Sequence, residues 1–168
     1  MPMKRLLMTI AAFIVVVSTM WTTAQNIGFP KNDANPLVGI WQMCFYVSET
    51  PNSKGELRSG HSFKILTNEG QMINLVNRPP HESIILGFGT WEVVSDSAFV
   101  EHITKTLDNP VLNNSDNLLE YSLSEDGNLL SLKFYIEKDE KGNVIDCWFH
   151  ETWRRVVMPQ ECPPDLIR

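Results

Sequence analysis

The feature that most constrains the fold is an alternation of apolar and polar residues, which has a period of two almost throughout residues 38–157. Side chains of a β-strand point in turn to opposite faces, so this alternation predicts strands with one buried face. No segment shows a convincing 3.6-residue period and no internal repeat is present, so the pattern predicts neither long helices nor a repeat array. Eight strands are expected, at residues 38–48, 61–67, 72–76, 88–94, 98–105, 117–124, 129–137 and 144–157.

Short glycine-containing turns separate several of these strands. The segments NEGQ (68–71), EDGN (125–128) and EKGN (140–143) are typical of hairpins, because glycine readily adopts positive φ. Sequential strands joined by hairpins form an antiparallel up-and-down sheet, whose two outer strands would leave backbone groups unpaired unless the sheet closes. We therefore predict an all-β fold, an eight-stranded up-and-down antiparallel β-barrel. The alternative is an immunoglobulin-type sandwich, but its longer cross-sheet connections and Cys…Trp…Cys spacing are not evident.

The N-terminal segment has the pattern of a secretory signal peptide. Lys4 and Arg5 precede the short apolar run 6–17, and Thr22-Thr23-Ala24 supplies small residues before Gln25. The run is shorter than the roughly 20 apolar residues of a comfortable membrane span, although an uncleaved anchor is the alternative. The sequence thus predicts export to the periplasm or the extracellular space, with no stable membrane span after cleavage.

These observations predict that the chain consists of four segments. They are a signal peptide at 1–24, an irregular leader at 25–37, the barrel at 38–157 and a proline-rich tail at 158–168. The formal net charge is −6, and it becomes about −8 without the first 24 residues. Because nucleic acids and anionic membranes require a basic face, neither is expected as a partner.

The three cysteines are Cys44, Cys147 and Cys162. Export permits one disulfide, and both Cys44–Cys162 and Cys147–Cys162 are possible pairs; three reduced, packed cysteines are an equal alternative. No Cys-x-x-Cys pair is present, so no metal site and no cofactor are predicted.

Closure of the barrel would place the first strand beside the last. Trp41 begins the apolar face of the first strand, and Trp153 and Arg155 end one face of the last strand. In an antiparallel pair these residues become neighbours, and a guanidinium over an indole contributes about 0.5–2 kcal/mol. We expect Arg155 to stack on Trp41 and its remaining donors to bind carbonyl groups at the closed end of the barrel.

The order of several short motifs resembles the lipocalin and wider calycin signature. The finer resemblance is to secreted bacterial lipocalin-like domains, many of unassigned function. The motifs are GIW at 39–41, GTW at 89–91, FVEHI at 99–103 and ETWRRV at 151–156. The resemblance implies a cup for a small apolar molecule and a structural plug made of Gly39, Trp41, Trp153 and Arg155. The chain departs from a typical lipocalin after the last strand, where three prolines in the final twelve residues disfavour a helix.

The candidate lining of this cup contains two carboxylates. The expected lining residues are Phe45, Trp91, Phe99, Glu101, Phe149 and Glu151. A buried carboxylate is unfavourable unless it is paired or hydrogen-bonded, and Arg155 is the expected partner of Glu151. The two glutamates are therefore interpreted as part of a structural Glu–Arg network, as a polar anchor for a ligand, or as an acid/base pair.

The sequence favours a non-enzymatic protein that binds a small hydrophobic or amphipathic molecule in its barrel. A second hypothesis is a protein-interaction module with a side-chain-filled barrel, which would use an apolar patch around Trp148 and the 106–116 loop. A third is a small isomerase or cyclase that uses Glu101 or Glu151, which requires a raised carboxylate pKa in an open cavity. The sequence leaves the oligomeric state open.

Overall fold

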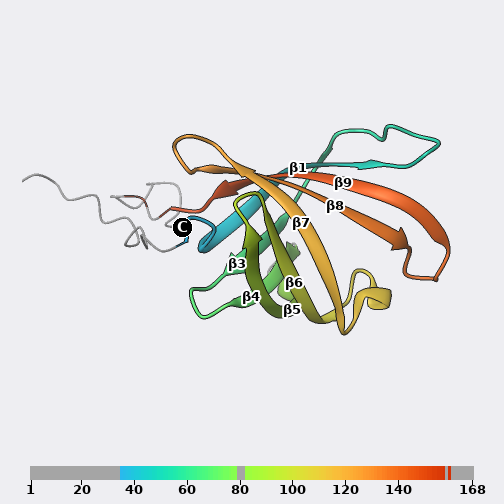
Figure 1. Cartoon of the computed structure of the whole chain (residues 1–168), viewed down its shortest axis with the longest axis horizontal. Coiled ribbons are helices and arrows are strands. Elements are labelled where there is room, and N and C mark those ends of the chain that lie inside the picture. Colours follow the sequence, from blue (N-terminus) through green and yellow to red (C-terminus); the bar gives the residue numbers. More distant parts are fainter. Residues whose placement is uncertain (1–34, 79–81, 158, 160–168) are drawn as a thin grey trace, which may run out of the picture. The chain divides into compact units, whose positions relative to one another are not determined.

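The computed structural model of the chain describes residues 35–78, 82–157 and 159. Within these residues one antiparallel sheet and one short 3₁₀ helix form the regular structure (Figure 1). The strands are β1 (Gly39–Glu49), β2 (Arg58–Ser59), β3 (Ser62–Leu66), β4 (Gln71–Arg78), β5 (Glu82–Ser95), β6 (Ala98–Thr106), β7 (Ser115–Leu123), β8 (Leu129–Lys138) and β9 (Val144–Arg155), and the 3₁₀ helix is Pro110–Leu112.

The sheet closes on itself through β1 and β9. Neighbouring strands follow the chain order from β3 to β9, and β1 pairs with β3 on one side and with β9 on the other. The result is an eight-stranded antiparallel up-and-down barrel, as predicted, and the two-residue β2 pairs with β1 beyond the end of β3. Closure pairs the backbone groups that the first and last strands of an open sheet would leave exposed.

One end of the barrel, here called the closed end, is filled by apolar side chains. It receives the start of β1, the end of β9 and the hairpins β3–β4, β5–β6 and β7–β8. Trp41 and Phe99 are fully buried there. The core cluster consists of Leu37, Trp41, Leu66, Met72, Trp91, Phe99, Ile103, Leu119, Leu130, Leu132 and Trp153.

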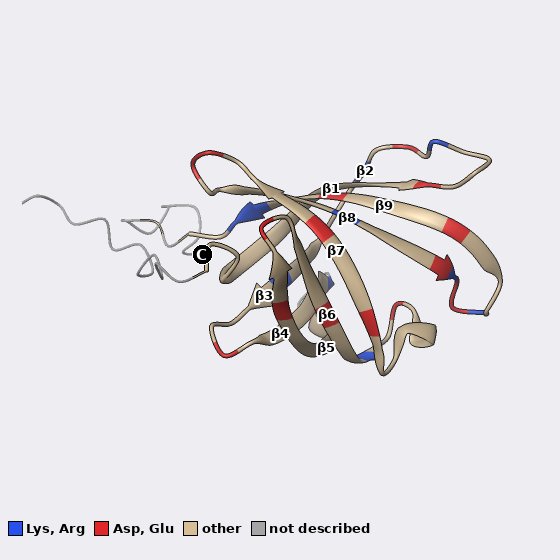
Figure 2. Ribbon diagram, viewed as in Figure 1, with Lys and Arg blue, Asp and Glu red and all other residues tan. Residues whose placement is uncertain are grey.

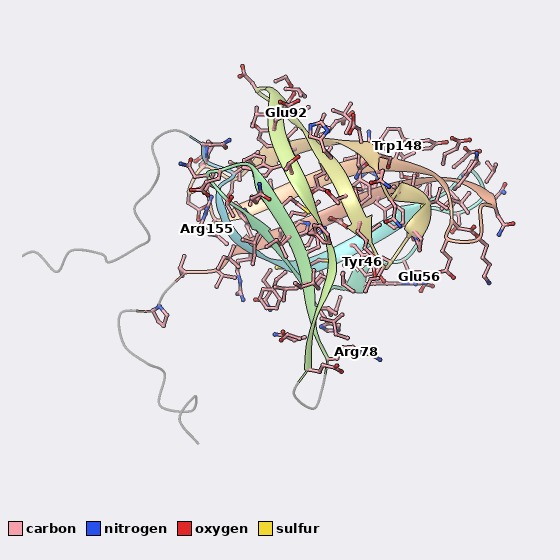
Figure 3. The ribbon with its side chains drawn as sticks, turned by 90° about the horizontal axis from the view of Figure 1, so that it is seen from below. Tyr46, Glu56, Arg78, Glu92, Trp148 and Arg155 are labelled. Atoms are coloured by element: carbon pink, nitrogen blue, oxygen red, sulfur yellow. The ribbon has the colours of Figure 1, made fainter. Side chains whose placement is uncertain are left out.

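The opposite, open end is formed by the end of β4, the start of β5, and the connections between β6 and β7 and between β8 and β9. Arg155 and Trp148 mark the two directions along β9, because Arg155 lies at the closed end and Trp148 lies toward the open end (Figure 3).

The main departure from the predicted strands concerns β5. This strand was expected to begin at residue 88, but it begins at Glu82 and passes through Gly87 and Gly89. The register shifts between Phe88 and Gly89, and a Cβ on Gly89 would lie 2.1 Å from the carbonyl oxygen of His102. Glycine therefore permits a bulge with close backbone approach at this point, rather than ending the strand.

Several sequence predictions concern residues outside the described part of the chain. These are the signal peptide at 1–24, most of the leader at 25–37, the tail at 158–168 apart from Pro159, and Cys162. Among the residues that are described, no helix is long and apolar enough to cross a membrane. Cys44 and Cys147 form no disulfide with each other.

Candidate functional site

A cavity of about 430 Å³ occupies the open half of the barrel. Its walls come from both sides of the barrel and from the turns at the open end. The apolar lining residues include Met43, Met72, Leu86, Ile103, Leu112, Leu119, Phe134, Ile136, Ile145 and Phe149. The barrel is thus hollow over part of its length, so the alternative of a barrel filled by side chains is wrong.

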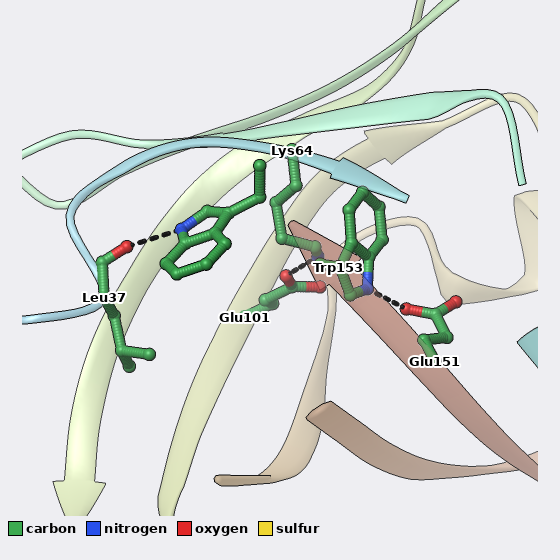
Figure 4. Close-up of polar contacts among 6 residues, drawn as sticks. Leu37, Lys64, Glu101, Glu151 and Trp153 are labelled. Atoms are coloured by element: carbon green, nitrogen blue, oxygen red, sulfur yellow. Dashed lines mark hydrogen bonds and ion pairs between the residues drawn. The ribbon is translucent and has the colours of Figure 1, made fainter. Parts of the chain in front are cut away.

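An ion pair lies at the floor of this cavity. Lys64 on β3 and Glu101 on β6 both line the cavity, and Lys64 Nζ donates a hydrogen bond to Glu101 Oε1 (Figure 4). Their side chains are only 4% and 5% exposed, so the pair is almost fully removed from solvent. Since β3 and β6 are not neighbouring strands, the pair joins distant parts of the barrel wall across its interior.

Glu151 is a third charged residue at this level. Its Oε2 accepts a hydrogen bond of 2.9 Å from Trp153 Nε1 (Figure 4). Lys64 Nζ lies 5.7 Å from the centroid of the Trp153 ring. Burial raises the pKa of Glu151 from 4.5 to about 7, although the positive charge of Lys64 and the indole hydrogen bond act in the opposite direction. Glu151 is therefore a carboxyl group that can change its protonation state near neutral pH.

Three asparagines add polar groups to the cavity wall. The Oδ1 atoms of Asn74 and Asn109 are buried and accept no hydrogen bond within the described residues. Asn117 is only 9% exposed and faces the cavity beside Glu101, its register partner on β6. Buried acceptors without donors are unfavourable, so a bound molecule that donates hydrogen bonds would satisfy them.

Three of the six predicted lining residues lie in the cavity wall, and two others lie in the closed-end core. Glu101, Phe149 and Glu151 line the cavity, as expected. Trp91 and Phe99 point inward but are buried in the closed-end core, where their rings meet edge to face with centroids 5.9 Å apart. They are absent from the cavity wall that the described residues form, so their assignment to the cup is corrected.

Phe45 does not line the cup, and the reason is a β-bulge. The β1–β9 register shifts between Met43 and Phe45, where Cys44 is the extra residue. Met43 faces the cavity, but one inserted residue reverses the alternation, and Phe45 is consequently 46% exposed on the outer face. The prediction that Phe45 belongs to the cup is therefore wrong.

The residues expected to plug the barrel meet at the closed end. Arg155 Cζ lies 4.1 Å from the centroid of the Trp41 ring, and Trp41 Nε1 donates to the carbonyl of Leu37 over 2.8 Å. Arg155 also donates to the carbonyls of Gly127 (2.9 Å), Val38 (2.9 Å) and Pro36 (2.6 Å).

Gly39, with φ of +148°, leaves room for this arginine. A Cβ at Gly39 would lie 2.7 Å from Arg155 Nη1. The Arg155 guanidinium donates its hydrogen bonds to carbonyl groups, so the structure corrects its expected pairing with Glu151. The neighbours of Glu151 are Trp153 and Lys64.

Lys64 is the site residue that sequence reasoning missed. It shares the inward face of β3 with Leu66, and a lysine on such a face must be paired if it is buried. The expectation of an inward-facing Glu101 could have suggested this partner. The alternation alone does not show which strand faces β6 across the barrel.

The outer face carries a separate aromatic group. Trp148 is 38% exposed, as its position in the alternation predicts. Its ring contacts that of Tyr135, with centroids 5.3 Å apart, and Lys133 Nζ lies 4.4 Å from its centroid. Among the described residues no group of three or more His, Cys, Asp or Glu side chains is arranged to hold a metal ion.

Comparison with known proteins adds the following. A family model described as a domain of unknown function (DUF4488) matches residues 36–164, which include the whole barrel. No curated protein matches the chain.

Proposed function

We propose that this chain, which belongs to the DUF4488 family, binds one small amphipathic molecule in the open half of its barrel. The observation that carries the proposal is the cavity of about 430 Å³, whose apolar walls stand over a polar floor. Ligand sites in proteins commonly measure about 300–1,000 Å³ and combine apolar walls with a few polar groups that orient the ligand.

The two parts of the cavity suggest how such a molecule would lie. The stacked rings of Phe134 and Phe149, whose centroids are 5.2 Å apart, form part of the apolar wall. Lys64, Glu101 and Glu151 form the floor. An apolar chain or ring system would contact the wall, and a polar group would reach the floor.

The signal-peptide pattern of residues 1–24 and the motifs shared with lipocalin-like domains support a broader proposal. In this proposal the protein is an exported, lipocalin-like carrier or receptor for its ligand. Its 20 acidic residues outnumber the 14 basic ones. Those in the described part of the chain are spread over several strands and turns (Figure 2). This distribution supports solubility rather than attachment to an anionic surface.

The proposal can be tested with the neutral fluorescent probe N-phenyl-1-naphthylamine. We expect saturable binding with one site per chain. Ile145→Trp places a large ring at the cavity wall and should weaken binding at least tenfold. Val144→Trp is the matched control, because Val144 is the adjacent residue of β9 and is 63% exposed. Absence of saturable binding, or equal binding by both variants, would contradict the proposal. Native mass spectrometry of the isolated chain would then identify any co-purifying ligand.

A second candidate function is proton-transfer catalysis of the isomerase type. It is favoured by one observation, the carboxyl group of Glu151, which faces an open cavity with its pKa raised by burial to about 7. A general base is most effective when its pKa is near the working pH. Conversion of 3-cyclohexenone to 2-cyclohexenone, followed by absorbance, would support this candidate if Glu151→Gln abolishes it and Glu125→Gln does not. No conversion above the buffer rate would count against it.

A further inference from the structure

We propose that the ligand of this cavity is a cationic amphipath, an apolar molecule that carries a protonated amine. This inference rests on the proposed function and adds the chemical class of the ligand. The inference rests on two observations. One is the charge of the cavity wall, and the other is a pair of acceptor atoms on that wall that receive no hydrogen bond from a described residue.

The charged residues of the described wall are mostly acidic. They are Lys64, Glu101, Asp108, Asp139, Glu140 and Glu151, so Lys64 is the single cation among the described lining residues. Its ammonium group is already bonded to Glu101 in the buried pair. A ligand anion would therefore meet no available positive charge on this wall.

The remaining carboxylates differ in how far their own surroundings satisfy them. Asp139 accepts hydrogen bonds from the backbone of Lys141 and Asn143 and from the Asn143 side chain, so it stabilises its own turn. Asp108, Glu140 and Glu151 make no ion pair with a described residue. These three carboxylates leave the cavity with an excess of negative charge that a bound cation would balance.

Unpaired acceptors point to the same ligand chemistry independently of charge. Asn109 Nδ2 donates to the carbonyl of Lys138 over 3.0 Å, which fixes the orientation of that amide. Its Oδ1 is buried and receives no hydrogen bond from any residue that the structure describes, and the same holds for Oδ1 of Asn74 on the wall formed by β4. An ammonium group offers three donors and no acceptor, whereas a carboxylate offers only acceptors. A protonated amine can therefore satisfy groups that a fatty acid would leave unpaired.

The aromatic wall is also compatible with a cation. Phe134 and Phe149 lie with an angle of 7° between their ring planes on the cavity wall. A cation near the face of an aromatic ring is attracted by the negative charge density of the ring, and the alkyl part of the ligand packs against the same surface.

Four decyl probes with different head groups test the proposal. Decylamine, decyltrimethylammonium, decanol and decanoate are used at pH 8, below their micellar concentrations, to displace N-phenyl-1-naphthylamine from the wild-type chain. We expect decylamine to bind at least tenfold more tightly than decanol, and decanoate to bind most weakly. Decyltrimethylammonium has the charge but no N–H donor, so we expect it to bind between decylamine and decanol.

Two variants locate the effect within the cavity. Glu151→Gln should reduce the preference for decylamine over decanol at least fivefold, because it weakens decylamine binding more than decanol binding. Glu125→Gln is the control, because it removes the same charge from an exposed turn that does not line the cavity. An equal loss of preference in both variants would show that general charge attraction, not the site, selects the amine, and would overturn the proposal.

The probe series separates this inference from the proposed function. If decanol binds but decylamine binds no better than decanoate, the cationic ligand is wrong while the amphipath-binding cavity stands. If neither N-phenyl-1-naphthylamine nor any decyl probe binds, both proposals fail.

Discussion

The guanidinium of Arg155 lies over the indole of Trp41, 4.1 Å from the ring centroid, and joins the last barrel strand to the first. The two residues are register partners in the β1–β9 pairing that closes the barrel. Trp41 is fully buried, so this contact is removed from solvent on the indole side.

Trp41→Ala should strongly destabilise the barrel. Truncation of a buried aromatic side chain costs about 3–5 kcal/mol, because the lost contacts leave a cavity. The free energy of unfolding from urea denaturation measures this change. Trp148→Ala is the control and should cost less, since Trp148 is 38% exposed on the outer face. A loss below about 1 kcal/mol for Trp41→Ala would mean that Trp41 does not plug the barrel.

Arg155→Lys should destabilise the barrel although it keeps the charge. A lysine ammonium cannot reproduce the guanidinium that reaches three carbonyl groups and covers the Trp41 ring at the same time. We expect a loss of about 1–3 kcal/mol in the free energy of unfolding. Arg154→Lys, on the exposed face of the same strand, should change it by less than about 0.5 kcal/mol. Similar losses in the two variants would contradict a specific role for Arg155.

Removal of one partner of the buried ion pair should lower the free energy of unfolding more than removal of both partners does. Lys64→Met leaves the Glu101 carboxylate buried and unpaired, which we expect to cost about 3–5 kcal/mol. The double variant Lys64→Met, Glu101→Leu replaces the pair by apolar side chains and should recover most of this loss. Urea denaturation of the two single variants and the double variant provides the comparison. Additive losses would indicate that the two residues do not interact.

The stability of the protein should depend on pH through Glu151. Its pKa is raised from 4.5 to about 7 in the folded state, so between these values the folded chain binds more protons than the unfolded chain. Stability attributable to this group therefore falls as the pH rises through that window, by up to about 3 kcal/mol at 1.36 kcal/mol per pH unit.

Glu151→Gln removes this pH dependence and isolates it from other titrating groups. The variant and the wild type should be nearly equally stable at pH 4, and the variant should be the more stable of the two at pH 8. Glu125→Gln should not show this pH-dependent gain in stability over the wild type. If Glu151→Gln brings no gain at pH 8, the carboxyl group is better solvated than its surroundings indicate.

The barrel itself was predictable because several independent signals agree. Alternation identified the strands, glycine turns identified the hairpins, and the need to pair the edge strands required closure. Closure in turn places Trp41 beside Arg155, since the start of the first strand must meet the end of the last.

The composition of the cup was less predictable, for two physical reasons. The extra residue Cys44 turns Phe45 to the outer face, and no residue pattern in β1 predicts that bulge. The position of Lys64 opposite Glu101 depends on which strands face each other across the interior, and alternation contains no information on this. Trp91 and Phe99 do point inward, but they belong to the packed core at the closed end and not to the cup. The alternation does not show how far along the barrel this core extends.

The Lys64–Glu101 pair acts as a partition between two compartments of the barrel. Toward the closed end the interior is filled by buried apolar side chains, and toward the open end it contains the cavity. The height of this partition therefore determines the depth of the cavity. Replacement of the pair by small apolar residues would therefore deepen the cavity without any change in the wall of strands that surrounds it.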